Sequence, residues 1–420
     1  MYLIYSILYA IVIILLFLPE YLKRPKELRK KWLREKFGFL DVTVLGSQSP
    51  VIWVHAVSVG EVNASIQLIR KIKSAYPQFN IILSTITDTG QKVAMEKASA
   101  GTKVVYLPFD MGFVLKGCFK SIKPKLFIVI ETELWPNIFR VLSEKGVPVI
   151  VLNGRISEKS FKGYRKISFF MKKVFAFVKI FGMQSIQDAG RLKEIGAEDK
   201  KIKVIGNFKF DMSMPEKMPE WAQKVTGPII VAGSTHNGEE EIIISAYKEN
   251  LAGFPELKLI LAPRHPERFK EAEDVISAKG VKYIKRSEMG TQSSESGMTE
   301  YNVILLDSIG ELSSVYAMAD IAIMGKSFLG FGGQNPLEPA YWEKPILCGP
   351  HMENFPFIKE FYNEGAAFEV TQETLAKKIK ELLINPDKAK AAGEKAKELC
   401  MKNSGAVDRA MEIIKGFIRG

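Results

Sequence analysis

From residue 51 onward, short apolar runs alternate with amphipathic stretches of helical period. This alternation constrains the fold more than any other feature of the chain, because it is typical of parallel βαβ units. It predicts a first doubly wound α/β domain with strands at residues 51–57, 80–86, 103–107, 126–130, 147–152, 180–184 and 202–205.

The alternation breaks at residues 211–227, where Pro215 and Pro219 flank a polar, methionine-rich stretch. It restarts with strands expected at 228–234, 257–265, 281–286, 302–308, 320–327 and 344–350. We therefore expect the α/β class with two Rossmann-like, doubly wound domains at 23–210 and 228–400 and a linker at 211–227. The closing helix at 401–420 is a candidate to pack back on the first domain. Ligands of such sheets bind at the carboxyl ends of the strands, which predicts a central cleft between the domains.

The first eighteen residues, "MYLIYSILYAIVIILLFL", carry no charge. A helix of that length spans about 27 Å, close to the thickness of the bilayer hydrocarbon. Lysines and arginines outnumber acids directly after it, which predicts a membrane anchor at residues 1–22 with the rest of the chain on the cytoplasmic face. A cleaved signal peptide is disfavoured because no basic n-region or small-residue cleavage site is present. The alternative is an N-terminal helix buried in protein.

The net charge of +12 predicts an acidic partner, which could be nucleic acid, an anionic membrane or a phosphorylated substrate. Cys118, Cys348 and Cys400 lie far apart, and neither a C-x-x-C pair nor an H-E-x-x-H helix is present. This pattern indicates a reduced compartment and no metal site.

Glu61 follows the first expected strand in "SVGEV" and falls in the first turn of the next helix. Taken alone, a carboxylate there is best explained as a complement to the helix dipole. Glu131 and Glu133 end the fourth strand in "IVIETELWPN". Side chains alternate along an extended segment, so these two acids are expected to point the same way. Acids that end a buried strand favour a ligand or basic partners.

Residues 153–181 interleave basic and aromatic side chains. Such a stretch suits a lipid interface or single-stranded nucleic acid, and an N-terminal anchor makes lipid the more economical partner. The alternative is a solvated helix whose aromatic face belongs to the core.

In the second half of the sequence, the residues after two expected strands are suited to binding an anion. Arg264 in "LAPRHPERF" stands just before a helix expected to begin near Pro266. In "LLDSIGEL", Ser308 and Gly310 are expected to cap a helix whose amides could hold a nucleotide.

The strongest pattern there is "MGKSFLGFGGQNPLEPAYW", in which Lys326 and a glycine loop lead to a helix opened by "NPLE". Glu338 in its first turn could accept both hydroxyls of a ribose. "GKS" at 325–327 has Asp320 where a P-loop requires glycine, and "GFGG" is not G-x-G-x-x-G. A kinase, ATPase or dehydrogenase is therefore disfavoured.

Several motifs together resemble the 3-deoxy-D-manno-octulosonic acid (Kdo) transferases of lipopolysaccharide biosynthesis. They are "HAVSVGEV", "ETELWPN", "NGRIS", "GNFKFD", "AGSTHNGEEE", "LAPRHPERF", "DSIGELSSVY" and "GGQNPLEPA". The resemblance covers nearly the whole chain in the family's order, including the N-terminal anchor.

The resemblance implies a GT-B glycosyltransferase of the inner membrane that moves Kdo from CMP-Kdo to the lipid A precursor with inversion, without a cofactor or metal. It implies Glu61 as general base, with Glu131 and Lys209 stabilising the transition state. It also implies that CMP is held by Pro263, Arg264, Ile309, Gly310, Glu311, Asn335, Pro336, Leu337 and Glu338.

A bisphosphorylated lipid at an anionic membrane surface explains the positive charge better than nucleic acid does. Two alternatives stay open: a GT-B transferase with another nucleotide sugar, and a non-catalytic basic protein that binds lipid or RNA.

Overall fold

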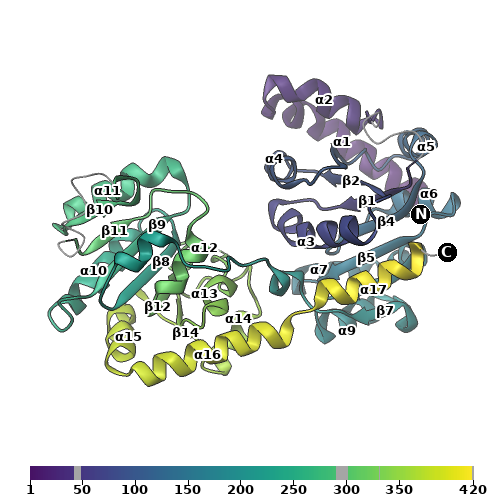
Figure 1. Ribbon diagram of the computed structural model, residues 1–420. Helices are drawn as coiled ribbons and strands as arrows, with labels where there is room; N and C mark the ends of the chain where they lie inside the picture. The colour runs from purple at the N-terminus through teal and green to yellow at the C-terminus, as the bar shows by residue number, and fades with distance from the viewer. Residues whose placement is uncertain (42–48, 290–300, 331, 419–420) are drawn as a thin grey trace. The chain divides into compact units, whose positions relative to one another are not determined.

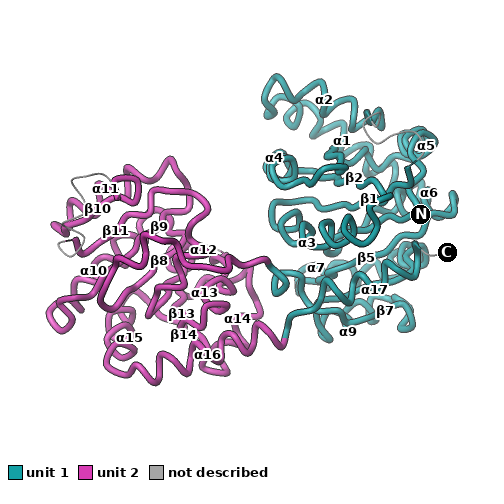
Figure 2. Tube along the Cα trace, in the orientation of Figure 1, with its two compact units in different colours: residues 1–212, 403–420 teal, residues 213–402 magenta. Residues whose placement is uncertain are grey.

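The computed structural model describes residues 1–41, 49–289, 301–330 and 332–418. The chain forms two compact units: residues 1–212 with 403–420 make unit 1, and residues 213–402 make unit 2 (Figure 2). The last two residues of the closing helix expected at 401–420 lie outside the described residues.

Within its described residues, unit 1 holds a seven-stranded parallel sheet in the order β3-β2-β1-β4-β5-β6-β7. Its strands are β1 Val51–His55, β2 Asn80–Thr85, β3 Thr102–Tyr106, β4 Pro124–Ile130, β5 Val149–Gly154, β6 Val178–Met183 and β7 Ile202–Val204. Its helices are α1 Tyr2–Lys23, α2 Lys26–Lys36, α3 Val59–Ala75, α4 Asp88–Lys97, α5 Gly112–Ser121, α6 Pro136–Glu144, α7 Glu158–Lys166, α8 Ser168–Phe175, α9 Ile186–Ile195 and α17 Ala406–Ile418 (Figure 1).

The central strands of unit 1 are apolar on both faces because helices cover both. Trp53 and Phe127 face a core built with α5, α6, α8 and α9. Ile52 and Leu126 face the other way, into a core built with α3, α4 and α17. Continuous apolar runs are what a doubly covered parallel sheet requires.

The described part of unit 2 holds a second seven-stranded parallel sheet in the order β10-β11-β9-β8-β12-β13-β14. Its strands are β8 Ile229–Thr235, β9 Lys258–Pro263, β10 Tyr283–Lys285, β11 Val303–Leu305, β12 Ile321–Met324, β13 Ile346–Cys348 and β14 Ala367–Glu369. Its helices are α10 Glu239–Leu251, α11 Phe269–Ala278, α12 Leu312–Val315, α13 Leu337–Tyr341, α14 Ile358–Asn363, α15 Gln372–Ile384 and α16 Pro386–Asn403, the last ending at the boundary with unit 1.

Each sheet has a point where the strand order reverses, between β1 and β4 in unit 1 and between β8 and β12 in unit 2. At such a switch point, the segments that follow the two neighbouring strands run to opposite sides of the sheet. Ligands of such sheets usually bind in the crevice that this leaves at the carboxyl ends of the strands. Glu61 follows β1, and Glu131 and Glu133 follow β4. The acidic motifs of unit 1 therefore stand at its switch point.

Candidate functional site

Glu61 lies in the first turn of α3, as the sequence predicts, with Ser58 at the N-cap position. One carboxylate oxygen accepts the Val57 backbone N–H at 2.7 Å and the other accepts the Ser58 hydroxyl at 3.0 Å. The side chain is only 7% exposed. These bonds hold the carboxylate in one orientation at the end of β1.

The electrostatics of Glu61 separate it from an ordinary helix-capping acid. Burial raises its pKa to about 8, and the carboxylates of Glu131 and Glu133 add to the rise, although the Val57 N–H opposes it. A carboxyl group tuned to this range exchanges a proton readily near neutral pH.

Glu131 departs from the extended geometry that the sequence suggests. Its φ of 60° lies in the left-handed region, so Glu131 and Glu133 do not share the extended segment from which their common direction was predicted. The strand ends at Ile130 and the chain turns before Trp135, the N-cap of α6. A non-glycine residue in this conformation is uncommon and marks a site whose surroundings enforce it.

The two acids after β4 have different electrostatic neighbours. Burial raises the pKa of Glu131, while the positive charges of Lys209 and Arg155 oppose that shift. Burial and the negative charge of Glu131 raise the pKa of Glu133 to about 7. Glu131 is thus the member of the cluster that is compensated by cations.

Lys209 reaches this cluster from the short 3-10 helix Phe208–Asp211. The backbone N–H of Phe208 donates to Asn153 Oδ1 at 3.0 Å, and the N–H of Lys209 donates to Asn207 Oδ1 at 3.0 Å, which fix the turn. Burial lowers the Lys209 pKa, and the Glu131 charge counteracts the drop. Of the residues predicted for catalysis, the structure therefore brings Glu61, Glu131 and Lys209 together.

In unit 2, the predicted CMP residues Pro263 and Arg264 end β9, and Ile309–Glu311 follow the neighbouring strand β11. The Arg264 side chain is exposed and makes no ion pair with any residue that the structure describes. Glu311 is held by the Arg286 guanidinium at 3.0 and 3.1 Å. These segments share the carboxyl edge of one sheet.

Asn335 and Pro336 lead into α13, where Pro336 is the N-cap and Leu337 and Glu338 are the first two helical residues. The Ser313 hydroxyl donates to Glu338 at 2.7 Å, which ties this segment to α12, the helix after Ile309–Glu311. The structure therefore brings the last two predicted CMP segments together.

One local prediction in unit 2 is wrong. Ser308 and Gly310 do not cap a helix, because α12 begins at Leu312 with Glu311 as N-cap, and the Ser308 hydroxyl bonds the Glu311 carboxylate instead. The helix expected near Pro266 is present: it begins with a 3-10 turn at Pro266–Arg268 and continues as α11 from Phe269. Arg264 stands just before that 3-10 turn.

Sequence reasoning missed Glu239, at the start of α10. Its carboxylate accepts the backbone N–H groups of His236, Lys326, Ser327 and Phe328 at 2.6–3.0 Å. The loop after β12, which looks like a phosphate cradle, is thus filled by a buried side chain of the same unit. The only sequence signal was the acidic run "EEE".

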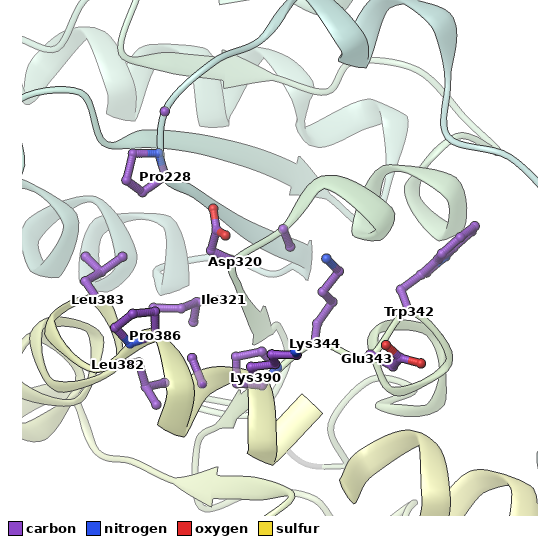
Figure 3. A pocket seen from close by; sticks show the side chains of 14 residues that line it. Pro228, Asp320, Ile321, Trp342, Glu343, Lys344, Leu382, Leu383, Pro386 and Lys390 are labelled. Carbon is purple, nitrogen blue, oxygen red and sulfur yellow. The ribbon is translucent and has the colours of Figure 1, made fainter. Parts of the chain in front are cut away.

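A cavity of about 570 Å³ lies in unit 2 at the amino ends of β8, β12 and β13 (Figure 3). Pro228, Asp320, Trp342, Lys344 and Lys390 are among its lining residues. Among the described residues, none of those predicted to hold CMP lines it, because they follow the opposite ends of the strands.

The basic, aromatic stretch 153–181 forms α7, α8 and the strands beside them. Phe175 and Phe181 belong to the core, and Phe161, Tyr164, Phe170 and Phe177 pack against it. For these aromatic side chains the core alternative is correct and the lipid interpretation is wrong. Phe169 stays 63% exposed, and the interleaved lysines face solvent.

Comparison with protein families matches residues 31–212 to the family described as 3-deoxy-D-manno-octulosonic-acid transferase (kdotransferase). A 3-deoxy-D-manno-octulosonic acid transferase of Haemophilus influenzae is 34% identical over 399 residues, which cover 92% of this chain and 91% of the relative. Another from Aquifex aeolicus is 33% identical, with 88% and 94% covered.

Solved structures agree on the fold. A glycosyltransferase from Rickettsia africae aligns with a TM-score of 0.57 at 16% identity, covering 89% of this chain and all of that one (100%). A UDP-GlcNAc 2-epimerase from Neisseria meningitidis aligns with a TM-score of 0.56 at 12% identity, covering 88% and 99%. The predicted GT-B architecture of two Rossmann-like units is confirmed.

Proposed function

Because the chain belongs to the 3-deoxy-D-manno-octulosonic acid (Kdo) transferase family and is therefore a glycosyltransferase, we propose that it moves Kdo from CMP-Kdo to the lipid A precursor, lipid IVA. The reaction belongs to lipopolysaccharide biosynthesis and inverts the anomeric carbon. In this proposal unit 1 binds the acceptor and unit 2 binds the donor nucleotide.

Glu61 is the proposed general base. Its carboxylate takes the proton of an acceptor hydroxyl, whose oxygen bonds to the anomeric carbon as the bond to the CMP phosphate breaks. Its raised pKa suits this step, since a base tuned toward the working pH transfers protons efficiently. Lys209 and Glu131 stabilise the charge that develops in the transition state.

CMP is the proposed ligand of Pro263, Arg264, Ile309–Glu311 and Asn335–Glu338. The exposed Arg264 guanidinium suits the departing phosphate, which is dianionic in part at neutral pH. Glu338, in the first turn of α13, is placed to accept hydrogen bonds from the ribose hydroxyls. These bonds would replace the one that it accepts from the Ser313 hydroxyl. No metal is required in this proposal, and no group of three or more metal-binding side chains occurs in the described parts of the chain.

The acceptor is a phosphorylated lipid, so the protein works at the cytoplasmic face of the bacterial inner membrane. One described helix, Tyr2–Lys23, is long and apolar enough to serve as the anchor. The net charge of +12 favours attraction to anionic headgroups.

The observation that carries the proposal is the meeting of Glu61, Glu131 and Lys209 at the switch point of unit 1. The test incubates the protein with CMP-Kdo, generated in situ, and lipid IVA, and reads the product mass. Glu61→Gln should lower transfer by about 10²–10⁴-fold while CMP binding persists. Near-normal transfer by folded Glu61→Gln would contradict the base assignment, and product from UDP-sugars alone would contradict the donor.

A further inference from the structure

Helix α1 has two chemically different faces. Exposed apolar side chains run along one of them from the first turn to the last, including Leu3, Leu8, Ile11, Ile14, Leu15 and Leu18. Their exposed fractions are 48–73%. An apolar face of this length on a water-soluble protein needs a partner.

The other face of α1 is bound to unit 1 by hydrogen bonds. The Tyr5 hydroxyl donates to Asp110 Oδ2 at 2.7 Å, and the Asp110 backbone N–H donates to the Tyr9 hydroxyl at 3.2 Å. Asn137 Nδ2 donates to the Ser6 hydroxyl at 3.0 Å. Asp110 and Asn137 are fully buried, so these bonds are protected from water.

Aromatic packing extends the attachment to both ends of the helix. The Tyr2 ring lies 5.6 Å from Phe170 of α8. At the other end, the rings of Phe17 and Tyr21 lie 5.8 and 6.4 Å from Trp32 of α2. Figure 1 shows α1 running along unit 1 rather than projecting from it, and α1 contacts α6.

A helix attached along its whole length cannot cross a bilayer by itself. Perpendicular insertion would carry the neighbouring helix α2, with its many lysines and arginines, toward the hydrocarbon, where each charge costs several kcal/mol. With α1 parallel to the surface, its apolar face enters the interface and the rest of unit 1 stays in water.

Charged side chains support a lipid partner over a second copy of the chain. Lys23, Lys26 and Lys30 are exposed next to the carboxyl end of α1, and Lys172 and Lys173 are exposed on α8, which contacts its amino end through Phe170. Basic residues at both ends of an apolar face match an anionic headgroup layer.

We propose that α1 is an in-plane membrane helix, with its apolar face in the headgroup and acyl boundary of an anionic bilayer and its tyrosine face held by Asp110. The protein is then monotopic. This inference deepens the proposed function and rests on it for the identity of the membrane.

The attachment of α1 to Asp110 also positions the candidate site of unit 1 relative to the membrane helix. Asp110 accepts the backbone N–H groups of Asn137 and Ile138 at 3.1 and 2.6 Å, at the start of α6. That helix directly follows the loop of Glu131 and Glu133. One buried carboxylate thus connects the membrane helix to the loop that would meet the acceptor headgroup.

The first test measures depth. Single cysteines replace Leu3, Ile11 or Leu18 in full-length Cys400→Ser protein, whose remaining cysteines are buried, and carry an environment-sensitive fluorophore. On vesicles of phosphatidylethanolamine and phosphatidylglycerol, all three probes should show the same shallow depth with lipid-borne quenchers. They should also remain reachable by a quencher added outside. An Ile11 probe at the bilayer centre with a protected Leu3 probe would mean a span and overturn the proposal.

The second test measures vesicle binding by sedimentation. Ile11→Lys combined with Leu15→Lys should weaken binding at least about tenfold, because two apolar side chains that enter the membrane interface become charged. Ile186→Lys, at an 81% exposed position on α9, is the matched control and should bind normally. Unchanged vesicle binding with a dimer converted to monomer would assign the face to a second copy instead.

Kdo transfer to an acceptor dispersed in detergent is measured as well, because it tests the proposed function independently of the in-plane arrangement. A protein that transfers Kdo but spans the vesicle overturns only the in-plane arrangement. A protein that lies in plane but uses no CMP-Kdo overturns only the function.

Discussion

At the scale of single residues, Glu61 is both a helix-capping side chain and a candidate reagent. Its bonds to Val57 and Ser58 would be enough to explain a structural carboxylate. Two further carboxylates nearby would not help a structural role, because they destabilise its ionised form. Their presence favours a group whose proton affinity is adjusted for chemistry.

The pH dependence of transfer tests this adjustment. Only ionised Glu61 accepts a proton, so kcat/KM should rise with pH to an inflection near the Glu61 pKa of about 8. Glu133→Gln removes a like charge, lowers that pKa and should move the inflection to lower pH, which the pH profile of kcat/KM measures. Glu194→Gln, exposed on α9, is the control and should leave the inflection in place. An inflection that stays at the same pH in Glu133→Gln would contradict the electrostatic coupling between Glu133 and Glu61.

The same pKa has a consequence for stability. Glu61 has a folded-state pKa above its ordinary value of 4.5, so folding favours its protonated form. Its contribution is fully present below the unfolded pKa and is lost as pH rises through about 8. Glu61→Gln keeps the neutral form at all pH values, and its advantage in urea unfolding over the wild type should therefore grow as pH rises from 4.5 to about 8 and level off above that. An advantage that is constant with pH would count against the raised pKa.

Glu239 is a buried residue whose replacement should destabilise unit 2. Glu239→Gln leaves one acceptor oxygen and one amide donor facing four backbone N–H groups. We expect a loss of about 3 kcal/mol in unfolding free energy, typical of a buried group left unsatisfied. Denaturant unfolding measures it, with Glu241→Gln, exposed in the same helical turn, as the nearly neutral control.

At the scale of elements, apolar runs predicted most strands because the central strands of each sheet are buried on both faces. This pattern missed β14, Ala367–Glu369, whose buried, partly buried and exposed residues form no continuous apolar run. The left-handed turn at Glu131 and the exact start of α12 could not be predicted, since tertiary hydrogen bonds and packing decide their backbone. The motifs marked the strand ends, but the contact of Lys209 with Glu131 depends on a 3-10 turn that carries no pattern of its own.

The closing helix α17 is an element whose attachment can be tested. Asp211 accepts the backbone N–H groups of Gly405 and Val407 at 2.5 and 2.6 Å, at its amino end. Asp211→Ala removes this cap and should lower the unfolding free energy of unit 1 by about 1 kcal/mol. Asp408→Ala, whose side chain is 70% exposed, is the control. Equal stability of the two variants would show that packing alone holds the helix.

At the scale of the whole molecule, the chain divides its chemistry between two sheets of the same kind. Acids and a lysine gather at the switch point of unit 1, whereas Arg264 and the segments around Glu311 and Glu338 gather at the carboxyl edge of unit 2. Because each unit has its own core, a ligand of one unit should stabilise that unit first.

CMP binding to the full-length protein tests this division by hydrogen exchange. At about 100 times its Kd, CMP should add up to about 2.7 kcal/mol of protection to amides of β9, β11 and β12, because only the folded unit binds it. Amides of β1 and β4 should change little. Arg264→Ala should weaken CMP binding and remove most of the amide protection at the same CMP concentration. Glu61→Gln should retain that protection. Protection centred on β1 and β4, or an Arg264→Ala protein with an unchanged Kd, would reassign the nucleotide to another surface.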